Sequence, residues 1–306
     1  MSNLKELENM LTDGKITRRT FMARVSAMGL MAAVSPVLLN SKAEAATPKK
    51  GGKLIMGSAG GSTSDSLEPG TLSHTMPQTV SETIRSELVE VNNKGEAIPE
   101  LAESWEASSD AVKWTFKLRK GVEFHNGKTL DAEDVIYSFN EHRGPDTKSA
   151  AKGIADPITD IKADGKNIVV FTLKEGNADF PYIASDYHIP VVPKGTKGKE
   201  YEKGIGTGPF VLQAWEPGVR FLGKRNPNYF KSDQPYFDEV EILGITDVNA
   251  RTNALKTGQI HVMNRCEPKT FHLLERAPGL QVLKLEGARH YTIPMLTTIK
   301  PYDNND

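Results

Sequence analysis

The sequence predicts an α/β fold with an antiparallel, β-rich insert over residues 81–203. Three features indicate it: a short apolar strand that leads into a glycine-rich loop, a later strand with strict period-two alternation, and capped helices between the strands. The chain has 306 residues, 38% of them hydrophobic, which is enough for one large domain or two lobes. Its single cysteine, Cys266, excludes an internal disulfide, so the fold must depend on its core.

The N-terminus has the pattern of a twin-arginine export signal. Arg18 and Arg19 stand directly before Thr20, Phe21 and Met22, and paired arginines ahead of an uncharged run are typical of that pathway. An ordinary secretory signal is the alternative, but it would need only positive charge. We therefore expect recognition of Arg18, Arg19 and Phe21 by the twin-arginine translocase.

The end of this leader has the features of a cleavage site. No ionisable side chain occurs over residues 25–41, and Ala43 and Ala45 then form the small-x-small pattern that a signal peptidase requires. A membrane anchor is the alternative, but Gly29 and Pro36 interrupt a run that is shorter and less apolar than the roughly 20 residues of a span. We expect cleavage after Ala45 and a periplasmic mature protein.

The charge of the mature chain excludes some partners. The full chain has a net charge of -1, and residues 1–45 carry six basic and four acidic groups, so their removal leaves -3. A mildly acidic domain without a basic run has no electrostatic attraction for nucleic acid or anionic lipid. We expect no nucleic-acid partner, and we expect a monomer.

The first mature segment contains the candidate ligand contacts. Leu54-Ile55-Met56 predicts a strand, and the glycine-rich residues 57–63 that follow predict a polar loop. Open α/β sheets bind ligands at the carboxyl ends of their strands, and glycines let a ligand approach backbone N–H groups. The candidates are Gly61, Ser62, Thr63 and Ser64. A solvated surface loop is the alternative. Beyond it, Thr79 and Glu82 have capping-box spacing and predict a helix over residues 80–90.

The middle of the chain predicts an antiparallel sheet with a helix. Apolar and polar residues alternate over residues 112–119, which indicates a strand with one wet face. Asp131, with Asp134 three residues later, predicts a helix N-terminus. Asp164-Gly165 separates two strand candidates, residues 158–163 and 166–173, and predicts a hairpin.

Weaker signals follow. A Gly/Lys-rich stretch, residues 194–208, indicates a crossing between subdomains, with a tight turn at Gly206 and Gly208, before a strand at residues 210–212. Asp247 predicts a helix that ends at Gly258. Short strands are expected near residues 260–262 and 280–285.

Catalytic and metal-binding motifs have no support. Residues 121–129 imitate a phosphate loop, but they place five residues between the glycines where four are needed. The histidines lack the paired spacing of a metal site, so neither metal nor cofactor is expected, and a structural hydrogen bond is expected for His125. No Gly-x-Ser-x-Gly elbow follows a strand. For Trp105 and Trp215 we expect core packing rather than ligand stacking.

Several blocks resemble the family 5 solute-binding proteins, the peptide-binding receptors of ABC importers. They are LVEVN (residues 88–92), GEAIPELAESWE (95–106), WTFKLRKGVEFHNGK (114–128), GTGPF (206–210) with Trp215 and Gly218, RNPNY (225–229), ITD (245–247) with Ala250 and Arg251, and LKTG (255–258). This resemblance spans nearly the whole mature chain. It implies a type II periplasmic-binding-protein fold, in which two lobes close on a ligand and a β-rich domain is inserted in the first.

The resemblance also implies domain boundaries and a role. Residues 46–80 and 204–270 would form the first lobe, residues 81–203 the insert, and residues 271–306 the start of a second lobe that is largely missing. The receptor would bind peptides or similar small solutes, deliver them to a membrane permease and perform no catalysis. An inactive truncated remnant and a periplasmic hydrolase are the alternatives.

Two positions depart from the family pattern. His261 stands where the family usually has an acid. Residues 295–306 resemble the approach to the second lobe, and the acidic residue that receives a peptide's amino terminus in relatives lies beyond them. No residue here inherits that role.

Overall fold

The computed structural model describes residues 48–284 together with Leu7 and Met10, which are helical. The chain divides into two units, residues 1–49 and 50–306, and the fold described below is that of the second unit. The predicted signal residues Arg18, Arg19, Phe21, Ala43 and Ala45 lie outside the described residues, as do residues 285–306.

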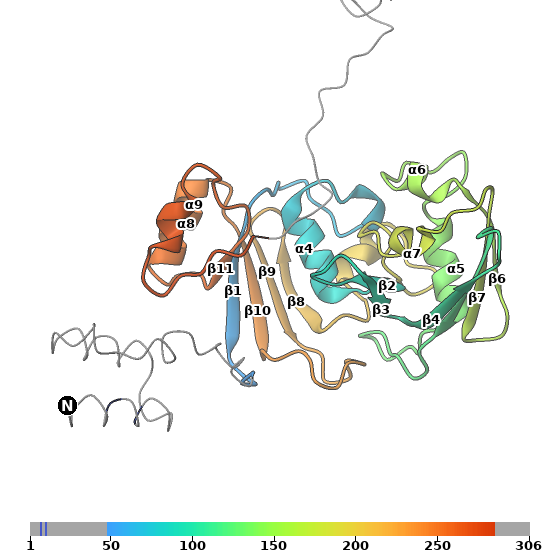
Figure 1. Ribbon diagram of the computed structural model, residues 1–306, viewed down its shortest axis with the longest axis horizontal. Helices are drawn as coiled ribbons and strands as arrows, with labels where there is room; N and C mark the ends of the chain where they lie inside the picture. Colours follow the sequence, from blue (N-terminus) through green and yellow to red (C-terminus); the bar gives the residue numbers. More distant parts are fainter. Residues whose placement is uncertain (1–6, 8–9, 11–47, 285–306) are drawn as a thin grey trace, which may run out of the picture. The chain divides into compact units, whose positions relative to one another are not determined.

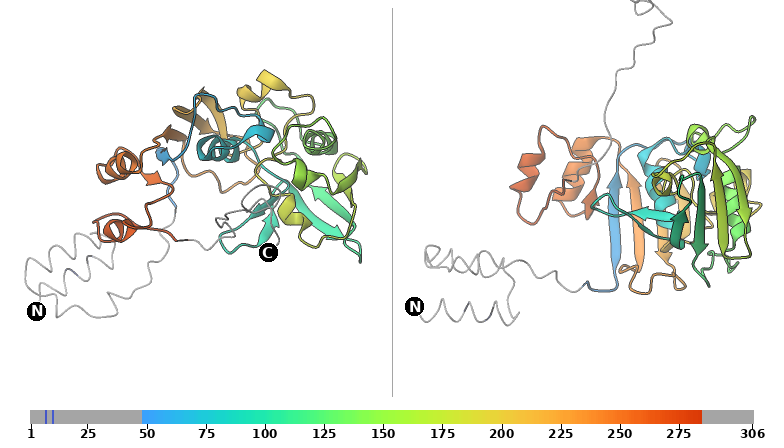
Figure 2. Two further views of the ribbon diagram at one scale, coloured as in Figure 1. Left: turned by 90° about the horizontal axis from the view of Figure 1, so that it is seen from above. Right: turned by 45° about the vertical axis from the view of Figure 1, so that its right-hand side comes forward.

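A five-stranded sheet joins segments from both ends of this unit (Figure 1). Its order is β11-β1-β10-β9-β8, and β1 runs parallel to both of its neighbours, whereas β10, β9 and β8 are successively antiparallel. In Figure 2 the blue strand β1 lies beside orange strands from much later in the chain. The strands are β1 (Lys53–Ser58), β8 (Phe210–Glu216), β9 (Arg220–Arg225), β10 (Glu239–Gly244) and β11 (Val262–Met263).

The two faces of the five-stranded sheet are covered by different helices. Helix α4 (Thr75–Ile84) packs against β8 and β10 on one face, and α8 (Val248–Lys256) packs against β1 on the other. Leu54 and Met56 pack against the core that contains α4, whereas Ile55 packs against the core that contains α8. A strand buried on both faces requires a continuous apolar run, which explains Leu54-Ile55-Met56.

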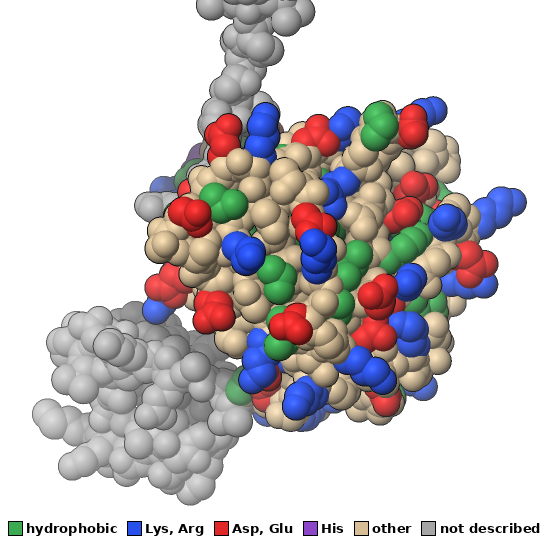
Figure 3. Space-filling view, turned by 90° about the vertical axis from the view of Figure 1, so that its right-hand side faces the viewer, with side chains coloured by type: hydrophobic (Ala, Val, Ile, Leu, Met, Phe, Trp, Pro, Cys, Tyr) green, Lys and Arg blue, Asp and Glu red, His purple; other side chains and the backbone are tan. Residues whose placement is uncertain are grey.

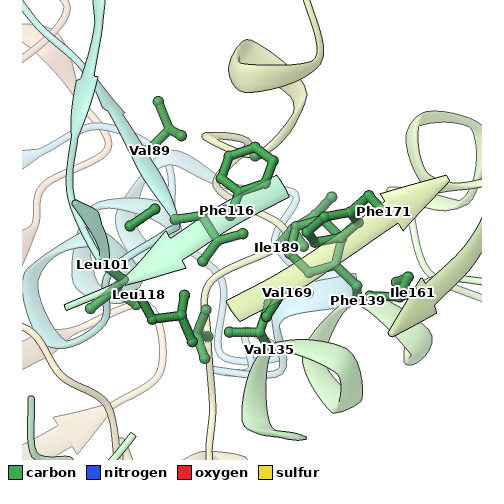
Figure 4. Close-up of a cluster of buried hydrophobic side chains, with 14 of the residues drawn as sticks. Val89, Leu101, Phe116, Leu118, Val135, Phe139, Ile161, Val169, Phe171 and Ile189 are labelled. Carbon is green, nitrogen blue, oxygen red and sulfur yellow. The ribbon is translucent and has the colours of Figure 1, made fainter. Parts of the chain in front are cut away.

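A separate four-stranded sheet is fully antiparallel, in the order β4-β5-β7-β6. Figure 4 shows its core, where Phe116, Phe139 and Phe171 meet. The rings of Phe139 and Phe171 are 4.8 Å apart at their centroids. Helix α5 (Ala132–Asn140) packs against this sheet. The strands are β4 (Ala102–Ala107), β5 (Lys113–Leu118), β6 (Ile158–Ala163) and β7 (Ile168–Leu173).

Short elements complete the described chain. A small two-stranded hairpin follows α4 and precedes the first strand of the four-stranded sheet. The remaining elements are short helices. They are β2 (Val89–Val91), β3 (Ala97–Pro99), α6 (Lys152–Ala155), α7 (Phe180–Ile183), α9 (Phe271–Glu275) and the 3-10 helices η2 (Pro69–Thr71) and η3 (Gly198–Lys203).

Elements with strong local signals are confirmed. Strand β5 buries Trp114, Phe116 and Leu118, as its period-two pattern predicts. Helix α5 begins after Asp131 with a complete capping box formed with Asp134. Helix α8 begins after Asp247, whose side chain accepts from the N–H of Ala250. The hairpin of β6 and β7 is confirmed, although β7 begins two residues later than predicted.

One predicted helix is shifted along the chain, and one predicted strand is absent from the described residues. The helix predicted over residues 80–90 begins at Thr75 and ends at Ile84. Thr79 therefore lies inside this helix, where its hydroxyl donates to the carbonyl of Thr75 and caps no terminus. Residues 89–91 belong to β2. The strand predicted at residues 280–285 is absent from its described part, residues 280–284.

The two large sheets are connected by two segments that run side by side, residues 84–88 and 204–209. The N–H of Gly208 donates to the carbonyl of Ile84 at 3.0 Å. A Cβ on Gly206 would lie 2.2 Å from that carbonyl oxygen, and one on Gly208 would lie 2.4 Å from the Ile84 carbonyl carbon. Close approach of two backbones, not the predicted tight turn, therefore explains both glycines.

Candidate functional site

The carboxyl ends of β1, β10 and β11 meet at one edge of the five-stranded sheet, because these strands are parallel. Open α/β sheets bind their ligands at this edge. Three loops begin here, after Ser58, Gly244 and Met263. They bring together residues that are more than 180 positions apart in the sequence.

Hydrogen bonds tie the three loops together. The side-chain oxygen of Asn264 accepts from the N–H of Ala59 at 2.8 Å, and its amide nitrogen lies 3.4 Å from the Ser58 hydroxyl. The N–H of Ile245 donates to the carbonyl of Ser58 at 2.9 Å. Asn264 thus fixes the exit of β1 against the exit of β11.

Arg251 of α8 hydrogen-bonds to the loops at the same edge. Its guanidinium donates to the carbonyls of Ile245 at 2.6 Å, Thr246 at 2.8 Å and Arg265 at 3.3 Å. The side chain is 2% exposed, and burial lowers its pKa. Among the described residues, its Nε has no hydrogen-bond partner. Since it holds the loops after β10 and β11, Arg251 is a positioning residue.

Three glycines interlock where the β8–β9 turn reaches this edge. A Cβ on Gly61 would lie 3.1 Å from the Cα of Gly218, and one on Gly244 would lie 2.1 Å from the Gly218 carbonyl oxygen. Gly218 itself has a φ of 71° and stands against the backbone of Ser62. Side chains at these positions would force the loops apart, so their backbones form one continuous rim.

The structure divides the four predicted contact residues into two pairs. Gly61 and Ser62 are half-buried against the turn that contains Gly218, whereas Thr63 and Ser64 are exposed. The N–H of Ser62 donates to Asp65 at 2.8 Å, and the hydroxyls of Ser62 and Ser64 lie 2.8 Å apart. The loop is therefore a closed turn at the carboxyl edge of the sheet. Ligand contact by Gly61, Ser62, Thr63 and Ser64 stays a prediction.

Sequence reasoning missed Asn264, Arg251 and the Gly218–Gly244 contact. A signal existed for Arg251, because it occupies an otherwise apolar side of the helix that Asp247 caps. Asn264 offered no local signal, since its partners Ser58 and Ala59 lie about 205 positions earlier.

Residues singled out for other chemistry have structural roles. His125 Nε2 lies 3.0 Å from the carbonyl oxygen of Gly208, which confirms the predicted structural hydrogen bond. Trp105 stacks on Phe116 with centroids 6.1 Å apart, and Trp215 packs against the core beneath α4, so both packing predictions are confirmed. Within the described residues, no group of three His, Cys, Asp or Glu side chains could hold a metal ion.

Two surface properties bear on partners. On the face in Figure 3, acidic and basic side chains are interspersed rather than gathered by sign. Such a face has no strong field for a polyanion. In the part of the chain that the structure describes, none of the helices has the length and apolar character that a bilayer span requires.

Comparison with known proteins identifies relatives. Residues 96–306 match the family model of the bacterial extracellular solute-binding proteins, family 5 Middle. Di/tripeptide-binding protein 1 of Pseudomonas aeruginosa is 27% identical over 301 residues, which cover 90% of this chain and 56% of that protein. The chain therefore spans little more than half the length of this relative.

Solved structures agree with the fold. AgaA from A. tumefacien R10, in complex with agropinic acid, matches with a TM-score of 0.69 and 28% identity, over 74% of this chain and 46% of that one. The oligopeptide-binding protein AppA from Bacillus subtilis, in complex with a nonapeptide, matches with a TM-score of 0.68 and 26% identity. The match covers 76% of this chain and 47% of that one. The predicted α/β fold of the type II periplasmic binding proteins is confirmed.

Proposed function

The chain belongs to the bacterial extracellular solute-binding proteins of family 5, and from this premise we propose that it is the substrate-binding component of an ABC importer. It captures peptides or similar small solutes outside the cytoplasmic membrane and delivers them to a permease. The printed names of its relatives support this role: one binds di- and tripeptides, and another was solved with a nonapeptide.

The observation that carries the proposal is the rim at the carboxyl ends of β1, β10 and β11. Gly61, Gly218 and Gly244 bring three backbones together there, and backbone N–H and C=O groups suit a ligand that is itself a peptide. We propose Gly61, Ser62, Thr63 and Ser64 as contacts on this wall. Ligand binding would stabilise a closed cleft by its greater affinity for the closed state.

We further propose the location and boundaries predicted from the sequence. Arg18, Arg19 and Phe21 would direct export by the twin-arginine translocase, and cleavage after Ala45 would release a monomeric periplasmic receptor without catalytic activity. Residues 81–203 would be the inserted domain. In support, every strand of the four-stranded sheet comes from this range, whereas every strand of the five-stranded sheet lies outside it.

Calorimetric titration of the full-length chain with di-, tri- and nonapeptides tests the function. We expect saturable binding without peptide cleavage. Thr63→Arg places a long cation on the exposed part of the loop and should weaken binding at least tenfold. Ala178→Arg, at an exposed position in the middle segment, is the matched control and should not change it. Equal binding by both variants would remove the loop from the site, and peptide cleavage by the pure protein would favour a hydrolase.

A further inference from the structure

A cavity lies at the end of the five-stranded sheet opposite to the rim of loops at the carboxyl ends of β1, β10 and β11. Its volume is about 470 Å³, and its walls come from the end of α4, from β2 and from the connection between β9 and β10. That connection leads into the amino end of β10, whereas the rim described above lies at the carboxyl end of the same strand. The cavity is therefore separate from the proposed peptide site.

Carboxylates outnumber cations in this cavity. Glu87, Glu90 and Glu100 line it together with one lysine, Lys231. The Lys231 ammonium lies 2.5 Å from a carboxylate oxygen of Glu90 and also pairs with Glu100. One ammonium is thus shared by two carboxylates. Glu87 makes no ion pair among the described residues, and its strongest neighbours are the like charges of Glu82 and Glu100.

Among the described residues, the wall contains one other cation, and its hydrogen bonds run to other segments. Arg85 is 2% exposed, and its guanidinium donates to the carbonyls of Leu67 at 2.5 Å and Tyr201 at 3.2 Å. These bonds anchor Arg85 to the connection between the sheets. It makes no ion pair with Glu87 among the described residues, although the two charges attract each other.

A buried hydroxyl in the same wall also lacks a partner. Ser86 is 2% exposed and lines the cavity, and its Oγ has no hydrogen-bond partner among the described residues. Buried polar atoms without a partner are energetically costly and rare in native proteins. A carboxyl without an ion pair next to a hydroxyl without a hydrogen-bond partner leaves room for a further donor.

Burial acts on the same carboxyls. It raises the pKa of Glu100 to about 7, despite Lys231, and it raises the pKa of Glu87 well above its ordinary value. Both groups are therefore poised to ionise when a cation enters.

The remaining walls suit the hydrocarbon part of a ligand. Tyr229 and Tyr187 present rings, and Val89 and Val91 present aliphatic groups. An ammonium group is attracted to aromatic faces as well as to carboxylates. Metal binding is disfavoured, because the described residues contain no group of three ligands at metal-binding geometry. We propose that this cavity binds a small organic ammonium ion, whose head pairs with Glu87 and donates to Ser86 while its alkyl part lies against Tyr229.

Titration calorimetry of the full-length chain with n-propylammonium chloride tests the proposal. Sodium chloride keeps the ionic strength constant, and propan-1-ol serves as the neutral analogue. We expect saturable binding of the ammonium ion and none of the alcohol. Because the cation favours ionised carboxyls, affinity should rise severalfold from pH 6 to pH 8. The protons released on binding should make the measured binding enthalpy depend on the ionisation enthalpy of the buffer.

Variants localise the binding. Glu87→Gln should lower the affinity at least tenfold, and Val91→Arg, which supplies a cation at the half-exposed edge of the cavity, should abolish it. Glu103→Gln is the control, because Glu103 pairs with Lys117 in the four-stranded sheet. Thr63→Arg should leave this affinity unchanged. No saturable binding, equal binding of propan-1-ol, or unchanged affinity in both Glu87→Gln and Val91→Arg would overturn the proposal.

Discussion

His142 is a buried histidine whose burial favours the neutral imidazole. It is 3% exposed, and its Nδ1 lies 2.6 Å from the hydroxyl of Ser149. Burial first, and the neighbouring His188 second, lower the pKa of His142 to about 4, although Asp186 opposes the shift. Between the ordinary pKa of 6.5 and about 4, the unfolded chain therefore binds a proton that the folded chain rejects.

This difference predicts a loss of stability in acid. As the pH falls from 6.5 to 4, His142 should remove up to about 3 kcal/mol of unfolding free energy, at 1.36 kcal/mol per pKa unit. His142→Asn keeps a polar group for Ser149 but cannot titrate, so its unfolding free energy should fall less over this range. Urea unfolding at pH 7, 5.5 and 4.5 measures the effect. His272→Asn changes an exposed histidine and should retain the wild-type loss. Parallel curves for all three proteins would contradict the assignment.

At the scale of elements, the sequence predicts those whose signal is local. Asp131 and Asp134 are three residues apart and form the capping box that their spacing predicts. Thr79 and Glu82 have the same spacing but lie inside α4, because a helix that buries Met76 and Val80 continues past any internal imitation of a cap. Tertiary packing decides between the two cases.

Other elements depend on distant partners. Strand β10 pairs with β1, with Glu239 opposite Lys53, so its position follows from a contact that no local pattern reports. The same holds for Asn264, which joins the exits of β1 and β11. The sequence therefore predicted a loop at residues 61–64 that the structure places at the carboxyl edge of the sheet, but not the residues that hold that edge together.

The interlocked glycines give a test at this scale. Gly244→Ala would place a methyl group 2.1 Å from the carbonyl oxygen of Gly218. Because backbone must move to relieve this overlap, we expect a loss of about 1–3 kcal/mol of unfolding free energy and weaker peptide binding. Gly153→Ala is the control, because Gly153 lies in a helix with an ordinary φ and a Cβ there would meet nothing within 4 Å. Its unfolding free energy should stay equal or rise by about 0.4–1 kcal/mol. Equal stability of the two variants would show that the rim tolerates side chains.

At the scale of the whole second unit, the chain forms two distinct hydrophobic cores. One core includes Phe116, Phe139 and Phe171, and the other includes Met76, Val80 and Phe221. Their connection is the pair of segments 84–88 and 204–209. Sequence reasoning placed a crossing at residues 194–208, but a pattern of glycines does not reveal which backbone lies against them.

The tryptophans allow this coupling to be measured, because they are divided between the cores. Trp105 and Trp114 belong to the four-stranded sheet, and Trp215 belongs to the five-stranded sheet. Trp215→Phe leaves reporters in the first core only, and Trp105→Phe combined with Trp114→Phe leaves a reporter in the second. If the connection makes the unit cooperative, both proteins should show one fluorescence transition in urea, each coincident with the transition seen by circular dichroism in the same protein.

Gly208→Ala, added to each reporter protein, should break that coincidence. A Cβ at this position would lie 2.4 Å from the Ile84 carbonyl carbon and 2.6 Å from the Arg85 nitrogen, so the two connecting segments must separate. The bond from Gly208 to Ile84 depends on their proximity, and the contact of His125 with the Gly208 carbonyl depends on the position of the segment 204–209. Losing these bonds uncouples the cores, and each fluorescence transition should then depart from the circular dichroism transition of its own protein. Coincident transitions after Gly208→Ala would mean that cooperativity passes through other contacts.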